Sequence, residues 1–188
     1  MVIRMVLGYA FIAGFLLFEV VLRRGESAKS LDRGGSDRGS TVALGVSYGT
    51  AVLLPLVLNL VQVGRMQAPV ISWLGLAAMV SGLALRAWSM QALGTFYSRT
   101  LRIVGSQEII DRGPYRLIRH PGYLGSILLW VGSGLAFSNW ASLIVVAVLM
   151  LGVYIYRINA EEEMLVAAFG ERYVLYRKRT WRLLPFLY

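Results

Sequence analysis

The chain has 188 residues, of which 57% are hydrophobic and 15% charged, and its formal net charge is +9. An ordinary soluble domain carries about 25% charged residues; here long apolar runs alternate with basic clusters, which indicates an integral membrane protein rather than a nucleic-acid-binding one. The absence of cysteine excludes disulfides and thiolate chemistry, and a single histidine excludes a histidine-rich metal site.

Five hydrophobic segments of membrane-spanning character are predicted in chain order. They cover residues 2–22, 41–63, 70–92, 122–137 and 140–157. The first is interpreted as a retained span, because it is too long and apolar for a typical signal peptide and no small-residue cleavage site follows it. Only Ser138 and Asn139 separate the last two segments, which therefore form a tight helical hairpin. These features predict an all-α integral membrane protein with about five transmembrane helices.

The chain is expected to consist of two parts, and the second begins with the polar stretch 93–121. Residues 1–92 form an N-terminal three-helix transmembrane region, and residues 93–188 hold the polar stretch, the hairpin and a charged tail. The tail is expected to form an amphipathic helix, which Gly170 is able to divide. Its apolar stripe at helical spacing consists of Leu165, Phe169, Tyr173 and Tyr176.

Lysine and arginine concentrate on one side of the predicted membrane. Five lie in 23–40, five in 93–121 and six in 157–188, against Arg4 and Arg65 on the other side. The positive-inside rule therefore predicts an external N-terminus and a cytoplasmic C-terminus, with the polar stretch facing the cytoplasm; in a bacterium this is the inner membrane. Arg86, inside the third segment, is expected either to extend toward the cytoplasmic end or to lie at a cavity.

Two polar clusters meet at this predicted cytoplasmic face. One is the run 113–125, GPYRLIRHPGYLG, with the only histidine, and the other is 157–163, RINAEEE. Because the hairpin is tight, the start of its first helix and the end of its second must be neighbours. Arg157 and Glu161 share a helix face. A purely structural alternative is a juxtamembrane ion pair with three solvated acids and an interfacial His120. Close helix packing is expected at Gly122, Gly125, Gly132 and Gly134.

Together these clusters resemble the isoprenylcysteine carboxyl methyltransferases and their bacterial relatives. The run 113–125 looks like the first half of the family's motif, and Arg157, the acidic run, FGERY at 169–173 and Leu184-Pro185 look like the second. The resemblance is specific over residues 93–188; earlier, Asp37-Arg38-Gly39-Ser40 is similar to bacterial members. Phospholipid N-methyltransferases and membrane sterol reductases share this half more loosely.

The resemblance implies S-adenosylmethionine as methyl donor, bound without a Rossmann fold. It places next to the cofactor Gln107, Glu108, Ile109, Ile110, Tyr115, His120, Pro121, Gly122, Tyr123 and Glu161. It places Arg157 on the substrate and gives Arg157 and Glu161 the catalytic roles. Gln107 departs from the family, which often has histidine there. Chemically, Glu161 suits the cofactor's ammonium group, and a two-pronged hydrogen bond from Arg157 suits an acceptor carboxylate.

The implied activity is methyl transfer to a lipophilic acceptor, foremost the carboxylate of an isoprenylcysteine-like compound entering sideways between the spans. The expected partners are therefore a prenyl-type or lipidated substrate and membrane lipids, with no nucleic acid and no metal. Two alternatives stay open: a nicotinamide-dependent membrane reductase of the related superfamily, and a non-enzymatic membrane scaffold. Small residues along several spans fit internal packing and dimerisation equally well.

Overall fold

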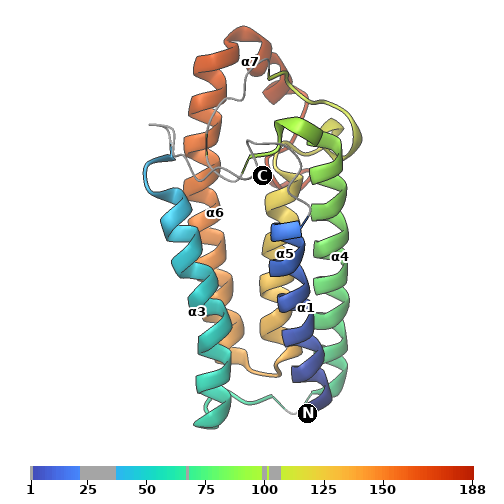
Figure 1. The fold of residues 1–188 in the computed structure, drawn as a ribbon, viewed down its shortest axis with the longest axis vertical. Helices are drawn as coiled ribbons and strands as arrows, with labels where there is room; N and C mark the ends of the chain where they lie inside the picture. The colour runs from blue at the N-terminus through green and yellow to red at the C-terminus, as the bar shows by residue number, and fades with distance from the viewer. Residues whose placement is uncertain (1, 22–36, 67, 99–100, 102–106) are drawn as a thin grey trace.

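A computed structural model describes residues 2–21, 37–66, 68–98, 101 and 107–188, and these form a bundle of helices along one long axis (Figure 1). Most of the basic loop 23–40 lies outside the described residues. The helices are α1 (Val2–Val21), α3 (Ser40–Leu60), α4 (Pro69–Leu93), α5 (Pro121–Ala136), α6 (Trp140–Phe169) and α7 (Glu171–Lys178), with short 3-10 turns η2 (Gly94–Phe96) and η3 (Gly113–Arg116). The described residues form no strand, so the predicted all-α class is confirmed.

The predicted segments coincide with helices to within a few residues, except at the end of the last one. Within the described part of the chain, three stretches are long and apolar enough to cross a membrane: α3, Pro69–Phe96 and α6. The apolar part of α1 is shorter, and α5 has 16 residues. A membrane-embedded helical fold is therefore confirmed, while the number of five spans stays a prediction.

The hairpin between α5 and α6 is as tight as the sequence predicts. Asn139 caps α6 by accepting a hydrogen bond from the Ser142 backbone N–H at 2.9 Å. A Cβ atom on Gly134 would lie 2.6 Å from the Cα atom of Leu143, so only glycine allows the two helices this approach. The start of α5 and the second half of α6 are consequently neighbours.

Helix α6 does not end where its membrane span was predicted to end. It continues without interruption through Arg157 and the acidic run to Phe169, and Gly170 then turns the chain into α7 with a φ of 55°. A positive φ costs glycine least, which explains the break at this position. The acidic run therefore rests on a rigid continuation of a spanning helix.

Helices α4 and α5 are in backbone contact through two pairs of glycines. A Cβ on Gly82 would lie 2.4 Å from the Gly125 carbonyl oxygen, and a Cβ on Gly75 would lie 2.6 Å from that of Gly132. The predicted close packing is correct for Gly125 and Gly132, whereas a Cβ on Gly122 would meet nothing nearer than 3.5 Å. This contact fixes the start of α5 against the end of α4.

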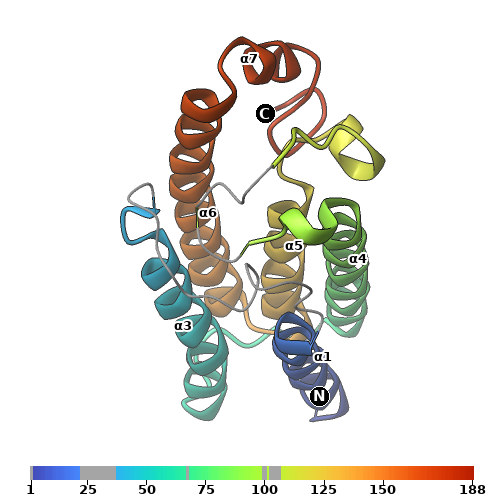
Figure 2. The same ribbon diagram turned by 45° about the horizontal axis from the view of Figure 1, so that its top comes forward.

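The arrangement places the sequence's two polar clusters at one end of the bundle. Figure 2 shows α1, α4 and α5 together on one side, α3 beside α6 on the other, and α7 with the C-terminal residues at this end. Below it, the core is rich in aromatic side chains: Phe15, Trp130, Phe137 and Tyr154 are fully buried.

Candidate functional site

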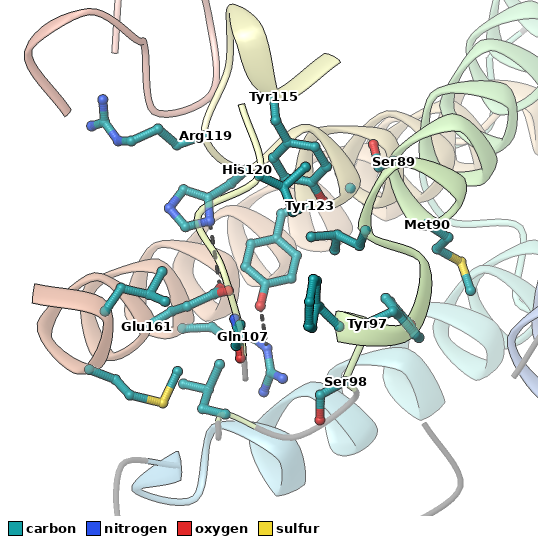
Figure 3. Close-up of a pocket in the computed structure, with 18 of the residues that line it drawn as sticks. Ser89, Met90, Tyr97, Ser98, Gln107, Tyr115, Arg119, His120, Tyr123 and Glu161 are labelled. Atoms are coloured by element: carbon teal, nitrogen blue, oxygen red, sulfur yellow. Dashed lines mark hydrogen bonds and ion pairs between the residues drawn. The ribbon is translucent and has the colours of Figure 1, made fainter. Parts of the chain in front are cut away.

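A cavity of about 340 Å³ lies where α5 begins and the acidic run of α6 starts, and Figure 3 shows it in close-up. Ten of the eleven predicted site residues line it: Gln107, Glu108, Ile109, Ile110, Tyr115, His120, Gly122, Tyr123, Arg157 and Glu161. Pro121 does not line it; its ring is buried at the first position of α5. Two segments distant in sequence thus form opposite walls of one pocket.

His120 lies between two carboxylates of α6. Its Nδ1 atom is 3.6 Å from Glu161 Oε2, and its Nε2 atom is 3.3 Å from Glu162 Oε1. Burial would lower the pKa of His120, but the interactions with Glu161 and Glu162 outweigh it and raise this pKa above its ordinary value. The imidazole also lies parallel to the ring of Tyr123, with centroids 5.5 Å apart. The two carboxylates therefore favour the charged form of the imidazole.

Glu161 lines the cavity, and one oxygen of its carboxylate has no hydrogen-bond donor among the described residues. Its Oε2 atom is buried and accepts no hydrogen bond from the described part of the chain, since His120 at 3.6 Å is too distant. Figure 3 shows Glu161, His120 and Tyr123 pointing toward one another. A buried, unsatisfied carboxylate oxygen is costly. It suits a ligand with a cationic donor, such as the ammonium group of an amino-acid-like cofactor.

Arg157 is held by the start of α3, which the sequence did not predict. Its Nε atom donates to the Tyr123 hydroxyl at 3.0 Å, and its Nη1 atom donates to Ser40 Oγ at 2.9 Å and Thr41 Oγ1 at 3.2 Å. Asp37 Oδ1 lies 3.7 Å from the same nitrogen. The Arg157 side chain is 3% exposed, and these hydrogen bonds hold its guanidinium in one position.

Asp37 organises this support. Burial would raise its pKa, but hydrogen bonds from Thr41 and Ser40 and the charge of Arg157 lower it, so the carboxylate stays ionised. The Thr41 hydroxyl donates to it at 2.6 Å. The sequence analysis did not assign Asp37 to the site. The one sign of its importance was that residues 37–40 are similar to bacterial members of the family.

The alternative with three solvated acids is wrong for Glu162. Its side chain is 3% exposed, and it accepts hydrogen bonds from Arg119 Nε at 2.8 Å and from Arg182 Nη2 at 2.9 Å. Arg177 Nε approaches it to 3.6 Å. Glu162 therefore ties α6 to the segment before α5 and to the C-terminal segment. Glu163, by contrast, is 61% exposed, as that alternative expected.

Arg86 lines the cavity. Its Nη1 atom donates to the Gly122 carbonyl at 2.9 Å and its Nη2 atom to the Tyr97 hydroxyl at 3.2 Å. The side chain is 8% exposed and its guanidinium lies 5.8 Å from the centre of the Phe15 ring. Arg86 thus lines the cavity as one expectation had it, and its two partners lie at the end of the bundle toward which the other expected it to extend.

Comparisons with known proteins identify the family of this chain. Residues 70–172 match the family model described as phospholipid methyltransferase. The chain is 29% identical over 119 residues to a probable protein-S-isoprenylcysteine O-methyltransferase of Oryza sativa subsp. indica, covering 62% of each protein, and so spans less than two thirds of that relative. It is 27% identical over 154 residues to protein-S-isoprenylcysteine O-methyltransferase B of Arabidopsis thaliana, covering 79% of this chain and 78% of the relative.

A solved structure has a similar fold. It is the eukaryotic intramembrane Ras methyltransferase described as isoprenylcysteine carboxyl methyltransferase, with a TM-score of 0.65 and 20% sequence identity, and the match covers 95% of this chain and 63% of that one. This likeness concerns the arrangement of helices, which is that of a membrane protein.

Proposed function

Since this integral membrane protein belongs to the phospholipid methyltransferase family, we propose that it transfers a methyl group from S-adenosylmethionine to a lipophilic acceptor. The foremost acceptor is the carboxylate of an isoprenylcysteine-like compound, on which the named relatives act. The observation that carries the proposal is that one cavity is lined both by Glu161, whose Oε2 atom lacks a hydrogen-bond donor, and by the fixed guanidinium of Arg157, four residues earlier on α6.

The cavity offers suitable partners for this cofactor. S-adenosylmethionine supplies an electrophilic methyl group on a sulfonium. Glu161 Oε2 would accept from its ammonium group, and the backbone and side chains of residues 107–110 would lie along it. The aromatic faces of Tyr115 and Tyr123 suit an adenine ring or a cation. The residues present therefore fit the cofactor.

Arg157 would orient the acceptor. A carboxylic acid is already ionised at neutral pH, so this reaction requires alignment and exclusion of water but no general base. The hydroxyls of Ser40 and Tyr123 hold the guanidinium in one orientation, and Asp37 offsets part of its charge. Directed hydrogen bonds, more than net charge, would then recognise the acceptor.

The tail of the acceptor would lie against an apolar side of the same cavity. This side consists of Leu16 of α1, Leu44 of α3, and Met90 and Leu93 of α4. These side chains come from helices of the membrane-embedded bundle, so a lipophilic tail would leave the bilayer without crossing water.

Titration calorimetry with S-adenosylhomocysteine tests the cofactor site in lipid nanodiscs. We expect saturable binding to the wild type, and a loss of roughly tenfold or more for Glu161→Gln, since a hydrogen bond to a charged group contributes about 1.5–3 kcal/mol. Glu163→Gln, on the exposed side of the same helix, should bind normally. Absence of saturable binding to folded wild type, or binding of NADPH instead, contradicts the proposal.

The acceptor is tested with methyl-labelled cofactor and an isoprenylcysteine analogue. Label should enter the free carboxylate as a base-labile ester and should not enter the corresponding amide. Arg157→Lys should lose this transfer while keeping S-adenosylhomocysteine affinity, because an ammonium cannot reproduce the planar donor pattern. Equal labelling of acid and amide would show that the acceptor group is not a carboxylate.

A further inference from the structure

The C-terminal segment, residues 181–188, is attached directly to the segment that precedes α5. The Trp181 N–H donates to the Leu117 carbonyl at 3.0 Å, and the N–H groups of Arg119 and His120 donate to the carbonyls of Trp181 and Arg182 at 2.7 and 3.1 Å. In Figure 1 the C-terminus lies below α7, at the level where α5 begins. This level lies near the end of the bundle at which α3 and α5 begin.

The segment folds into a closed turn that presents apolar side chains outward. The N–H groups of Leu183 and Leu184 both donate to the Tyr188 carbonyl, at 2.9 and 3.0 Å. Leu183 points into the main core and is 5% exposed, whereas Phe186 and Leu187 are 84% and 80% exposed. Phe186 also has a φ of 68°, a costly conformation for a bulky residue.

Neighbouring side chains enlarge the exposed surface. The ring of Trp181 packs on that of Phe186 with centroids 5.5 Å apart, and Leu117, whose carbonyl accepts from the Trp181 N–H, is 51% exposed. We call this surface the C-terminal patch; it consists of Leu117, Trp181, Leu184, Phe186 and Leu187. Large apolar side chains gathered in this way on a protein surface mark a contact with another apolar phase.

Basic side chains border the patch. Arg177, Lys178 and Arg179 close α7, and Arg116 precedes Leu117; all four are exposed. Arg179 pairs with Asp111 at 2.7 Å and Arg177 approaches Glu162 to 3.6 Å, while Glu171, the acidic side chain of α7, lies at the far end of that helix. The border is therefore positive, which complements anionic lipid head groups.

We propose that the C-terminal patch inserts into the interfacial layer of the membrane in which the bundle is embedded, with its basic border on anionic lipid head groups. Apolar side chains beneath a cationic border are the pattern of interfacial anchors, and tryptophan is enriched at this depth. The patch lies level with the end of the bundle, so the same bilayer reaches it. The proposal rests on membrane embedding alone and not on the proposed reaction.

This anchor would act on the cavity through short connections. The segment that carries the patch bonds to the backbone of His120, and Arg182 donates to Glu162, which also faces His120. Contact with lipid would therefore hold the cavity wall at a fixed depth.

Site-directed spin labelling tests the insertion, and the cysteine-free sequence permits single labels without background. Phe186→Cys and Leu187→Cys are labelled in nanodiscs that contain anionic lipid. Val148→Cys on α6, 67% exposed, is the lipid-facing control, and Glu171→Cys is the aqueous control. Collision rates with oxygen, which enriches in lipid, are compared with those of a water-soluble nickel chelate.

We expect oxygen to collide more often than nickel at positions 148, 186 and 187, and less often at 171. The high exposure of Phe186 and Leu187 makes these changes compatible with folding, and the Val148 label reports that the bundle is inserted. Nickel accessibility at 186 and 187 equal to that at 171 overturns the proposal. Dipolar broadening between labels at position 187 also overturns it, since the patch would then contact a second copy of the chain.

Discussion

Replacing Glu162 with glutamine should destabilise the protein far more than the same change at Glu163. The two residues are adjacent on α6 and chemically identical, but Glu162 is 3% exposed and Glu163 is 61% exposed. Glutamine keeps the shape of the side chain and removes its charge. Arg119, with a side chain 8% exposed, would then lose a buried counter-ion, and His120 would lose one of the two carboxylates beside it.

The magnitudes follow from burial. Breaking a buried ion pair by removing one partner costs about 3–5 kcal/mol. We expect about 3 kcal/mol, because Arg177 and Arg182 are 41% and 24% exposed and can turn toward water. Glu163 pairs with Arg38 at 2.9 Å, but both are 61% exposed, and such a pair contributes about 0–1 kcal/mol. At roughly 2–4 °C per kcal/mol, Tm should fall by about 6–12 °C for Glu162→Gln and by less than about 4 °C for Glu163→Gln.

The assay is thermal unfolding of both variants in nanodiscs at pH 7, followed by circular dichroism. All samples share one heating rate, because unfolding of a membrane protein is often irreversible and the midpoint then depends on that rate. Equal midpoint shifts for the two variants, or a Glu162→Gln midpoint within about 2 °C of wild type, would refute the reasoning from burial.

Three further predictions concern the helix contact, the histidine and the arginine support. Gly82→Ala should lower the unfolding midpoint by the equivalent of about 1–3 kcal/mol, since its Cβ meets backbone atoms of α5 at 2.4 Å, whereas Gly49→Ala, with nothing within 4 Å, should not lower it; equal shifts would contradict the contact. Folding raises the pKa of His120, so the protonated imidazole stabilises the folded state. This contribution to the free energy of unfolding is complete below about pH 6.5 and is lost as pH rises through the folded-state pKa. Nuclear magnetic resonance of the single histidine should give a pKa above about 6.5, and the midpoint of His120→Gln should lack the wild-type decline at higher pH; a pKa below 6.5 would contradict the charged imidazole. Asp37→Asn should raise the acceptor KM about tenfold, corresponding to ~1.4 kcal/mol, with S-adenosylhomocysteine affinity unchanged, because Asp37 supports Arg157 and not Glu161; a joint loss of both affinities would instead indicate a general structural defect.

Local features of the sequence predicted the helices and much of the site. The lengths of the hydrophobic segments predicted the positions of the helices. The two-residue turn at Ser138 and Asn139 predicted that Arg157 meets the start of α5. The bond from Arg157 to the Tyr123 hydroxyl at 3.0 Å confirms this. Connectivity alone carries such an inference, because two antiparallel helices joined by a minimal turn have only one arrangement.

The partners that come from distant segments could not be predicted in the same way. Helical geometry separates Glu162 from Glu161 by about 100°, which suggested solvent. The C-terminal segment covers that side, and Arg182 reaches Glu162 from 20 residues downstream. Likewise Ser40 is 117 residues from Arg157, and nothing in the periodicity of α3 indicates which helix its first turn will meet. Long-range packing, not local propensity, decided both positions.

The unbroken length of α6 has a consequence for the choice of acceptor. Its 30 residues extend about 45 Å, more than the roughly 30 Å hydrocarbon layer, and Arg157 lies roughly 25 Å along the axis from Trp140. The helix therefore sets the depth at which Arg157 stands, measured from the opposite membrane surface. A lipid tail dissolved in the bilayer presents its polar end at a depth fixed by its own length and by membrane thickness. The protein would then select acceptors by the depth of their polar end as well as by head-group chemistry, and this selection would change with the thickness of the host membrane.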